Sequence, residues 1–357
     1  TFTKSHARYA SKYSWNGSKQ HDVMSVTAIV ILNYNGIDFL KKYLGILIKT
    51  SGNYEIIVAD NGSTDSSLDW LKKNHSEIRA IVLKENNGYA GGYNLALKEV
   101  AADYYALINS DVETTLNWLD PLVDFLEEHP DYSAVQPKIL DQNDPSKFEH
   151  AGAAGGQLDA WGYPFCRGRI FDTIENDRGQ YDDAIDVFWT SGACMVIRAE
   201  DFNDIGGFDA DFFAHMEEID LCWRLAMKGK KFRYSPKSTV HHVGGGTLAA
   251  SHPQKTYLNF RNGLVMLLKN LPKKQLIKIP LRMIFDLAAA FLFWKHQGFG
   301  HFKAVCKAEL DFILNLRKYW RNRSQHTHPK ISLEHPVESV ALQYFLFNKK
   351  TYKELNQ

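Results

Sequence analysis

The chain has 357 residues, of which 45% are hydrophobic, and its formal net charge at neutral pH is +1. So many apolar side chains can form a large core, which excludes a protein that is disordered along its whole length. The near-neutral charge argues against a protein that binds nucleic acid through a strongly basic surface. The cysteines show no CxxC spacing, so we expect neither a zinc site nor a disulfide framework, and a reducing cytoplasm fits the composition.

Residues 1–24 are polar and aperiodic, and they lack the cationic and apolar segments of a secretory signal. Met24 comes directly before the first apolar run. We therefore expect residues 1–24 to be a leader or a disordered tail outside the fold.

From residue 26 onwards, short apolar runs alternate with longer amphipathic stretches. A helix is expected after each run, the first of them over 36–50, and the runs themselves predict strands over 26–33, 54–60, 79–84 and 103–109. Continuous apolar strands separated by helices indicate a mostly parallel sheet with helices on both faces. We therefore predict a doubly wound α/β fold.

The second half of the chain has a different character. Residues 152–186 are rich in glycine and irregular, which predicts a loop or a small subdomain over the site. Strand character returns in residues 187–198, and residues 231–246 predict a pair of strands. Beyond His252 the pattern changes to long helices with clustered lysine and arginine.

Polar side chains come directly after the predicted strands. These residues are Asn33, Asp60, Asn87, Asn109 and Asp111. Asn and Asp favour turns, which would be a sufficient reason for any one of them. Because ligands of open α/β sheets bind at the carboxyl ends of the strands, their recurrence favours a binding site along this edge.

Two motifs at this edge have the chemistry of a nucleotide or phosphate site. Residues 109–113 read NSDVE, and acids two residues apart at a strand end can bind a divalent cation that also binds phosphates, although short acidic turns are frequent. Residues 85–97 form a glycine-rich loop that enters a helix, where backbone N–H groups can approach a phosphate or ribose. This loop is neither a P-loop nor GxGxxG, which argues against a kinase or a Rossmann dehydrogenase.

Three acids, Glu217, Glu218 and Asp220, stand at the start of a helix-like run that includes Arg224. A solvated helix start is one explanation, because acids are stabilised at the positive end of a helix dipole. At ~100° per residue, Glu218 would lie on the more apolar face, apart from the other three. Burial raises a carboxyl pKa and makes the group a better proton acceptor, so we predict chemistry for Glu218 and an i,i+4 ion pair for Asp220 and Arg224.

In this order, the motifs VILNYNG, VADNGSTDSS, ENNGYAGGYN, LINSDVE, SGACMVIR, GGFDADFF and EEIDLCWR resemble the inverting glycosyltransferases of family two, which have the GT-A nucleotide-diphospho-sugar transferase fold. Within that family the chain is most similar to rhamnosyltransferase-type enzymes that build bacterial surface polysaccharides. The resemblance runs from residue 30 to residue 246. It implies a GT-A catalytic domain over 25–250, followed by a helical region over 251–357.

The resemblance implies a role for each group of residues. The nucleotide would lie against Asn33, Asn35, Asp60, Asn61, Asn87, Gly88, Gly91, Asn94 and Asn109. A divalent cation, Mg²⁺ or Mn²⁺, would bind to Asp111 and His241, with His242 as the second choice. The acceptor would lie against Trp189, Ser191 and Gly192.

The acid pair of this family usually reads Glu-Asp, and here it reads Glu217-Glu218. Glu218 is therefore the expected base, with Glu217 and Asp220 as the alternatives. It would deprotonate an acceptor hydroxyl as the diphosphate leaves, with inversion at the anomeric carbon. The expected donor is deoxythymidine diphosphate rhamnose, then a uridine diphosphate hexose or galactofuranose, and the acceptor is a glycan or a lipid-linked molecule.

The basic helices after residue 255 allow two interpretations. The apolar segment from Ile279 to Trp294 contains Arg282 and Asp286, whereas a spanning helix needs ~20 largely uncharged residues. An amphipathic surface for peripheral membrane contact is one interpretation, and a buried helical subdomain or a homodimer interface is the other. A lipid-linked acceptor would place the protein in the cytoplasm, at the inner face of the plasma membrane.

Two other functions are compatible with parts of the pattern. A sugar nucleotidyltransferase would have a basic, glycine-rich triphosphate loop near the N-terminus, which VILNYNG lacks. A noncatalytic nucleotide-sugar-binding protein would tolerate the loss of Glu218 and would bind without turnover. The complete set of acids argues against it.

Overall fold

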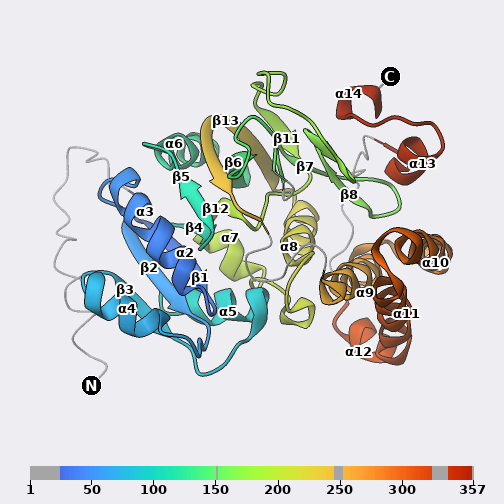
Figure 1. Cartoon of the computed structure of the whole chain (residues 1–357), viewed down its shortest axis with the longest axis horizontal. Coiled ribbons are helices and arrows are strands. Elements are labelled where there is room, and N and C mark those ends of the chain that lie inside the picture. Colours follow the sequence, from blue (N-terminus) through green and yellow to red (C-terminus); the bar gives the residue numbers. More distant parts are fainter. Residues whose placement is uncertain (1–24, 150–151, 245–251, 324–336, 356–357) are drawn as a thin grey trace.

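The computed structural model describes residues 25–149, 152–244, 252–323 and 337–355 (Figure 1). The predicted leader over 1–24, the glycines at 245 and 246 and the predicted boundary between 250 and 251 lie outside the described residues.

A mixed sheet forms the centre of the molecule, with the strand order β11-β13-β6-β12-β4-β1-β2-β3 and with β5 paired to β13. The pairs β1–β2, β1–β4, β2–β3 and β6–β13 are parallel, whereas β12 is antiparallel to both of its neighbours. The strands are β1 (Thr27–Asn33), β2 (Glu55–Asp60), β3 (Arg79–Val82), β4 (Tyr104–Asn109), β5 (Val112–Thr114), β6 (Tyr132–Asp141), β11 (Ile185–Val187), β12 (Cys194–Arg198) and β13 (Lys231–His242).

Both faces of this sheet are buried, as the continuous apolar strands predict. In β1, Ala28 and Val30 belong to one hydrophobic core, and Ile29 and Ile31 belong to a second core on the opposite face. The covering helices are α2 (Ile37–Phe39), α3 (Gly45–Thr50), α4 (Ser67–Asn74), α5 (Gly88–Leu97), α6 (Asp120–Glu128), α7 (Ala199–Asp204) and α8 (Glu217–Ala226). A π-helical segment (Leu40–Leu44) joins α2 to α3, within the helix predicted over 36–50.

The glycine-rich region folds into a small antiparallel sheet with the order β10-β9-β8-β7. Its strands are β7 (Gly156–Leu158), β8 (Pro164–Cys166), β9 (Arg169–Ile170) and β10 (Thr173–Ile174). The prediction of a strand pair over residues 231–246 was wrong. Residues 231–242 form one long strand, β13, whose register with β6 shifts between Ser235 and Thr239.

Helices dominate the C-terminal part of the chain (Figure 1). They are α9 (Pro253–Asn270), α10 (Lys278–Gln297), α11 (Phe299–Leu314), α12 (Leu316–Arg321), α13 (Val340–Phe345) and α14 (Tyr352–Leu355). The side chains of residues 264–268 on α9 belong to the same hydrophobic core as strands β1, β2 and β4. Within the described ranges, no helix has the length and apolar character needed to cross a membrane.

Candidate active site

The carboxyl ends of β1 and β2 meet at the predicted edge, because the two strands pair in parallel with Asn33 beside Asp60. Asn33 Nδ2 donates to Asp60 Oδ2 at 3.0 Å and to Ser63 Oγ at 3.2 Å, and Ser63 N donates to Asp60 Oδ1 at 2.9 Å. Asn33 Oδ1 is buried without a hydrogen-bond partner among the described residues. An unpaired buried acceptor is costly, so this atom is available to a polar ligand.

Asn35 and Asn61 order the loops on either side of this edge. Asn35 has a left-handed backbone (φ 50°), and its Oδ1 accepts from the N–H groups of Thr64 and Asp65 at 2.7 and 3.2 Å. Asn61 Nδ2 donates to the carbonyl oxygen of Gly88 at 2.9 Å, and Asn61 Oδ1 accepts from Asn87 N at 3.1 Å. Both asparagines therefore shape the backbone that a nucleotide would meet.

The glycine-rich loop brings α5 close to the segment before α8. Gly88 has φ 69°, and a Cβ there would lie 2.3 Å from the carbonyl oxygen of Phe213, so no other residue fits without a shift. Asn94 is used differently from the prediction, because both ends of its amide bind the backbone of Phe208 at 2.6 and 2.9 Å. Asn94 thus joins two elements. Gly91 lies on the buried part of α5, where an added Cβ would meet only Asn87.

Asp111 lies in a buried cluster that sequence reasoning found only in part. Strand β5 pairs with β13 so that His242 is opposite Val112, which brings the imidazole to Asp111. His242 Nε2 is 3.1 Å from Asp111 Oδ1, and His242 Nδ1 is 3.2 Å from Glu149 Oε2. Burial alone would lower the pKa of His242, but the two carboxylates raise it to about 10.

The histidine in this cluster is the second choice, not the first. The structure places His242 against Asp111, and His241 is the neighbouring residue on β13, where it pairs opposite Glu113. Successive side chains of a strand point to opposite faces, so only one of the two can reach Asp111. Strand parity, which depends on the register with β5, decides between them.

The carboxylates of this cluster are candidate ligands for a divalent cation that would share them with a diphosphate. The carboxylates of Asp111 and Glu149 offer oxygen ligands of the kind that Mg²⁺ and Mn²⁺ prefer. The side chain of Asn109 lies beside them, at 3.4 Å from His242 Nε2. Within the described ranges, however, no group of three or more His, Cys, Asp or Glu side chains is placed so that it could hold a metal ion. Phosphate oxygens and water would have to complete the coordination sphere.

The acid pair lies on the first turn of α8, beside the turn that precedes β12. A Cβ on Gly192 would lie 3.7 Å from Glu218 Oε1 and 3.2 Å from Tyr89 Oη, and the Tyr89 hydroxyl donates to the carbonyl of Gly192 at 2.6 Å. Both glutamates have one buried Oε2 atom without a partner among the described residues.

Burial dominates the electrostatics of this pair. It raises the pKa of Glu218 to about 7, against the opposing effect of backbone N–H groups that include that of Gly192. Burial and the nearby charge of Glu218 raise the pKa of Glu217 well above its usual value. Glu218 was predicted to lie on the more apolar face of the helix, but Glu217 is the more enclosed acid, with 4% of its surface exposed, whereas Glu218 is partly exposed. The buried pair therefore favours its protonated forms more than free glutamates do.

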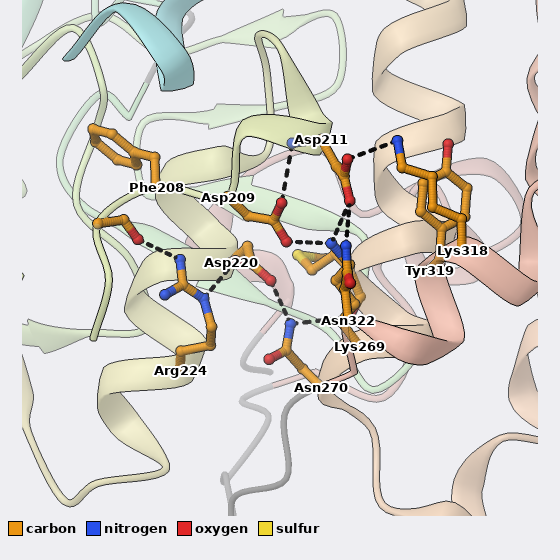
Figure 2. A network of polar contacts seen from close by, with 12 residues as sticks. Phe208, Asp209, Asp211, Asp220, Arg224, Lys269, Asn270, Lys318, Tyr319 and Asn322 are labelled. Carbon is orange, nitrogen blue, oxygen red and sulfur yellow. Dashed lines mark hydrogen bonds and ion pairs between the residues drawn. The ribbon is translucent and has the colours of Figure 1, made fainter. Parts of the chain in front are cut away.

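Asp220 has a structural environment. Its carboxylate accepts from Arg224 Nε at 2.7 Å, the ion pair predicted at i,i+4, and from Asn270 Nδ2 on α9 at 2.7 Å (Figure 2). Arg224 also donates to the carbonyl of Gly207 at 2.9 Å. Asp220 is fully buried, and its contacts fix α8 to its neighbours. The carboxylate of Asp220 therefore has a structural role.

The residues predicted to contact the acceptor lie in the turn before β12 and on its approach. Ser191 N donates to Gln136 Oε1 at 3.0 Å, and Ser191 Oγ accepts from Ala193 N at 3.1 Å. Trp189 is buried, its Nε1 donates to the carbonyl of Gln157 at 2.9 Å, and its ring covers Gly156. Trp189 thereby attaches the small sheet to the turn that carries Gly192.

A short series of contacts connects Asp111 with Glu218. His242 contacts both Asp111 and Asn109, Asn109 N donates to the carbonyl of Ala193 at 3.0 Å, and the adjacent Gly192 lies against Glu218. The antiparallel pairing of β4 with β12 produces this proximity, since it places the end of β4 beside the turn before β12.

Sequence reasoning missed Glu149, Gln136 and Tyr89. Glu149 follows no strand end in its own segment, and only the fold of the chain after β6 brings it to His242. Tyr89 lies inside the motif ENNGYAGGYN, so its position was visible, but nothing in the sequence indicated that its hydroxyl would reach Gly192.

Comparison with known proteins adds independent findings. The family model described as glycosyl transferase family 2 matches residues 28–206. An N-acetylglucosaminyl-diphospho-decaprenol L-rhamnosyltransferase of Mycobacterium tuberculosis is 26% identical over 255 residues, 65% of this chain and 83% of that protein. Rhamnosyltransferase WbbL of Escherichia coli K12 is 25% identical over 260 residues, 70% of this chain and 94% of that protein.

Two solved structures share the fold. GalNAc-T7 with UDP, GalNAc and Mn²⁺ has a TM-score of 0.55 at 14% identity, over 87% of this chain and 59% of that chain. The mannosyltransferase PcManGT of Pyrobaculum calidifontis, in complex with GDP-Man and Mn²⁺, has a TM-score of 0.50 at 12% identity, over 89% of each chain.

Proposed function

The chain belongs to glycosyl transferase family 2, and from that premise we propose that it transfers L-rhamnose from a nucleotide-diphospho-sugar to a hydroxyl of a lipid-linked glycan. The fold and the general activity were predicted correctly. The chain is a glycosyltransferase of polysaccharide synthesis with the GT-A fold and a C-terminal helical region, and inversion is typical of its family.

The observation that carries the proposal is the acid pair beside the turn that precedes β12. Glu218 combines a pKa of about 7 with one buried oxygen that has no partner among the described residues. A general base works best when its pKa is near the operating pH and when an atom is free to accept the proton. Burial and the nearby charge of Glu218 raise the pKa of the second acid, Glu217, well above its usual value, which favours the protonated form of Glu217 beside Glu218.

In the proposed mechanism, Glu218 Oε2 accepts the proton of the acceptor hydroxyl as the hydroxyl oxygen attacks the anomeric carbon. The bond from that carbon to the diphosphate breaks in the same step, so the configuration inverts. The backbone N–H of Gly192 binds the carboxylate of Glu218, and Tyr89 binds the carbonyl of Gly192. Asn33, Asp60 and the loops shaped by Asn35 and Asn61 would bind the nucleotide at the strand edge.

A divalent cation bound by Asp111 would neutralise charge on the departing diphosphate. Among the residues of this cluster, Asp111 is the most suitable ligand for the cation, because it lies just after β4, on the same edge of the sheet as Asn33 and Asp60. Supporting this, both fold neighbours were solved with Mn²⁺. Mg²⁺ and Mn²⁺ are both compatible with these ligands.

The donor, acceptor and location are proposed from the relatives. Two of them are rhamnosyltransferases, which favours deoxythymidine diphosphate rhamnose as the donor, ahead of uridine diphosphate sugars. The name of one relative specifies a diphospho-decaprenol acceptor. We therefore place this chain in the cytoplasm, at the inner face of the plasma membrane.

Turnover with and without Glu218 tests the proposal. With deoxythymidine diphosphate rhamnose, a lipid-linked N-acetylglucosamine acceptor and Mn²⁺, we expect release of the nucleoside diphosphate and an inverted glycosidic bond. Glu218→Gln should lower kcat by about 10²–10⁴-fold, because general base catalysis contributes that much, while nucleotide binding persists. Glu200→Gln, an exposed acid on α7, is the control and should be unaffected. Near-normal turnover of folded Glu218→Gln would refute the role of the base, and binding without turnover in the wild type would indicate a noncatalytic binder.

A further inference from the structure

Helix α10 buries charged side chains and exposes apolar ones, the reverse of the usual arrangement. A surface helix ordinarily buries its apolar side chains and exposes its charges. In α10 the buried residues include Arg282 and Asp286, which form an ion pair at 2.8 Å, and the guanidinium of Arg282 stacks at 3.2 Å on the ring of Tyr163. The charges that interrupt the apolar segment are thus held inside the protein.

The opposite face of α10 is apolar and exposed. Its residues recur at helical spacing, and Ile284 and Phe291 are 62% and 57% exposed. The set on this side is Ile277, Leu281, Ile284, Phe285, Phe291 and Leu292. A face of this size on a soluble domain marks a contact with a partner or a membrane.

The turn between α10 and α11 extends the apolar face with aromatic rings. The centroids of Trp294 and Phe299 are 5.3 Å apart, and those of Phe291 and Phe302 are 5.1 Å apart. Trp294 is 49% exposed. Both helices lie at the outer end of the molecule, on the far side of α9 from the central sheet (Figure 1). We call the exposed apolar residues of α10 and of this turn the apolar face.

The exposed charges of residues 271–323, which contain the apolar face, have one sign. Lysines and arginines are exposed on this part of the chain: Lys273, Lys274, Lys295, Lys303, Lys307, Arg317 and Arg321. The acids between residues 271 and 323 are Asp286 and Glu309, which are buried, and Asp311, which is partly buried and accepts from Asn315. Within this described range, no carboxylate is exposed to balance the cations.

We propose that the apolar face and its cations dock the enzyme on a bilayer of anionic lipids, with α10 lying in the interface. Apolar and aromatic side chains would enter the acyl boundary, and the cations would contact the anionic headgroups. A second copy of the chain fits less well, because a symmetric contact through these helices would bring the cations of both copies together, and residues 271–323 have no exposed carboxylate to pair with them. The inference rests on the proposed function in one respect. A lipid-linked acceptor has its reactive end at the membrane surface, so docking there would bring the enzyme to its acceptor.

Vesicle binding of the full chain tests the docking. We expect sedimentation with vesicles of phosphatidylglycerol and phosphatidylcholine, weaker binding to phosphatidylcholine alone, and loss of the difference at high salt. The double variant Ile284→Asp/Phe291→Asp should lower the partition coefficient by at least about tenfold, and so should Lys303→Glu/Lys307→Glu. The control Val82→Asp/Leu116→Asp changes two exposed apolar residues on the α/β part, and should bind as the wild type does.

Turnover on a water-soluble acceptor separates the two proposals. The docking variants should keep the wild-type rate on that acceptor and lose rate only when the acceptor is embedded in vesicles. Wild-type protein that turns over but ignores anionic vesicles would overturn the docking and leave the proposed function standing. Wild-type protein that binds vesicles but transfers no sugar would overturn the proposed function alone. A stable dimer that Ile284→Asp/Phe291→Asp converts to monomers, without vesicle binding, would show that the face joins two copies and would also overturn the docking.

Discussion

Two neighbouring carboxyl groups on α8 differ in burial, and we propose a different task for each. Glu217 is almost wholly enclosed and its pKa lies well above the usual value, whereas Glu218 reaches solvent in part and has a pKa of about 7. The pH dependence of kcat/KM should therefore reflect the ionisation of Glu218. We expect kcat/KM to rise with pH and to level off above about 7, as Glu218 becomes ionised.

Glu217→Gln should make the protein more stable, by an amount that grows with pH. The folded pKa of Glu217 is raised above its unfolded value by burial and by the charge of Glu218. As pH rises from the unfolded value near 4.5 towards the folded value, the unfolded chain releases the proton and the folded chain does not, so folding loses stability. Each unit of pKa difference corresponds to about 1.4 kcal/mol.

Melting temperatures of wild type and Glu217→Gln at pH 5 and pH 8 measure this effect. The variant should melt at the higher temperature at pH 8, and the gap should be smaller at pH 5. A gap that does not change with pH would mean that Glu217 is ionised in the folded protein.

His242 and His241 form a matched pair of variants. His242→Gln removes the imidazolium that pairs with Asp111 and Glu149. Two buried carboxylates are then left without this positive charge, which should cost about 3–5 kcal/mol of stability. His241→Gln should cost within about 0.5 kcal/mol, as ordinary surface substitutions do. Urea unfolding and the Mn²⁺ dependence of turnover are the measurements, and equal effects of the two variants would contradict the assignment of His242.

At the scale of elements, α9 holds the segment that leads into α8. Residues Phe213, His215 and Met216 have φ values of 65°, 69° and 72°, a left-handed conformation that costs about 1–3 kcal/mol for each non-glycine residue. The two N–H groups of the buried Asn262 Nδ2 are shared among the carbonyls of Phe212, Ala214 and His215, whose oxygens lie at 2.9, 2.9 and 2.7 Å. This one amide therefore offsets part of the strain and sets the position of the acid pair.

Lys269 adds a second connection from α9, since it pairs with Asp209 and, at 3.2 Å, with Asp211, which also binds Lys318 of α12 at 2.8 Å (Figure 2). The figure shows these side chains converging between the 207–212 segment and the C-terminal helices. The segment before α8 is thus fixed from the C-terminal side by charges as well as by Asn262.

Asn262→Ala should lower kcat more than it changes the KM for the donor. The acid pair would lose its positioning, whereas the nucleotide edge at Asn33 and Asp60 makes no contact with Asn262. We expect at least a tenfold loss of kcat, since small displacements of a catalytic group cost on the order of 10²-fold, and a shifted midpoint of the pH profile. Gln275→Ala, exposed on the same side of the molecule, is the control. An unchanged pH midpoint with a proportional loss of folded protein would reduce Asn262 to a purely structural role.

At the scale of the whole molecule, the α/β part and α9 share one hydrophobic core. Leu264, Val265, Met266, Leu267 and Leu268 pack in the same cluster as Val30 of β1 and Leu221 of α8. Burial of such a side chain stabilises by about 1.5–3 kcal/mol, so the joint contribution of these five is comparable to the whole stability of an ordinary domain.

A chain that ends at residue 250 should therefore fail to fold cooperatively. Circular dichroism and thermal unfolding would show a broad transition or none. A sharp transition close to that of the full chain would mean that the α/β part is an independent domain. In that case the predicted boundary between 250 and 251 would also be a boundary of stability.

Local sequence determined the elements and the chemistry near strand ends. Apolar runs predicted β1, β2, β3 and β4, and the polar residues after them lie at the strand edge for which we propose nucleotide binding. The ion pair between Asp220 and Arg224 was visible as well, because partners four residues apart on a helix are neighbours whatever the rest of the fold does.

Contacts between distant segments were decided only by the tertiary structure. The register of β5 on β13 selects His242 over His241, and the path of the chain after β6 brings in Glu149. The packing of α10 hides Arg282 and Asp286 and turns the apolar side outward, although the segment alone allowed a buried helix. Such outcomes depend on which face or parity meets a partner far along the chain, and periodicity within one element cannot specify that partner.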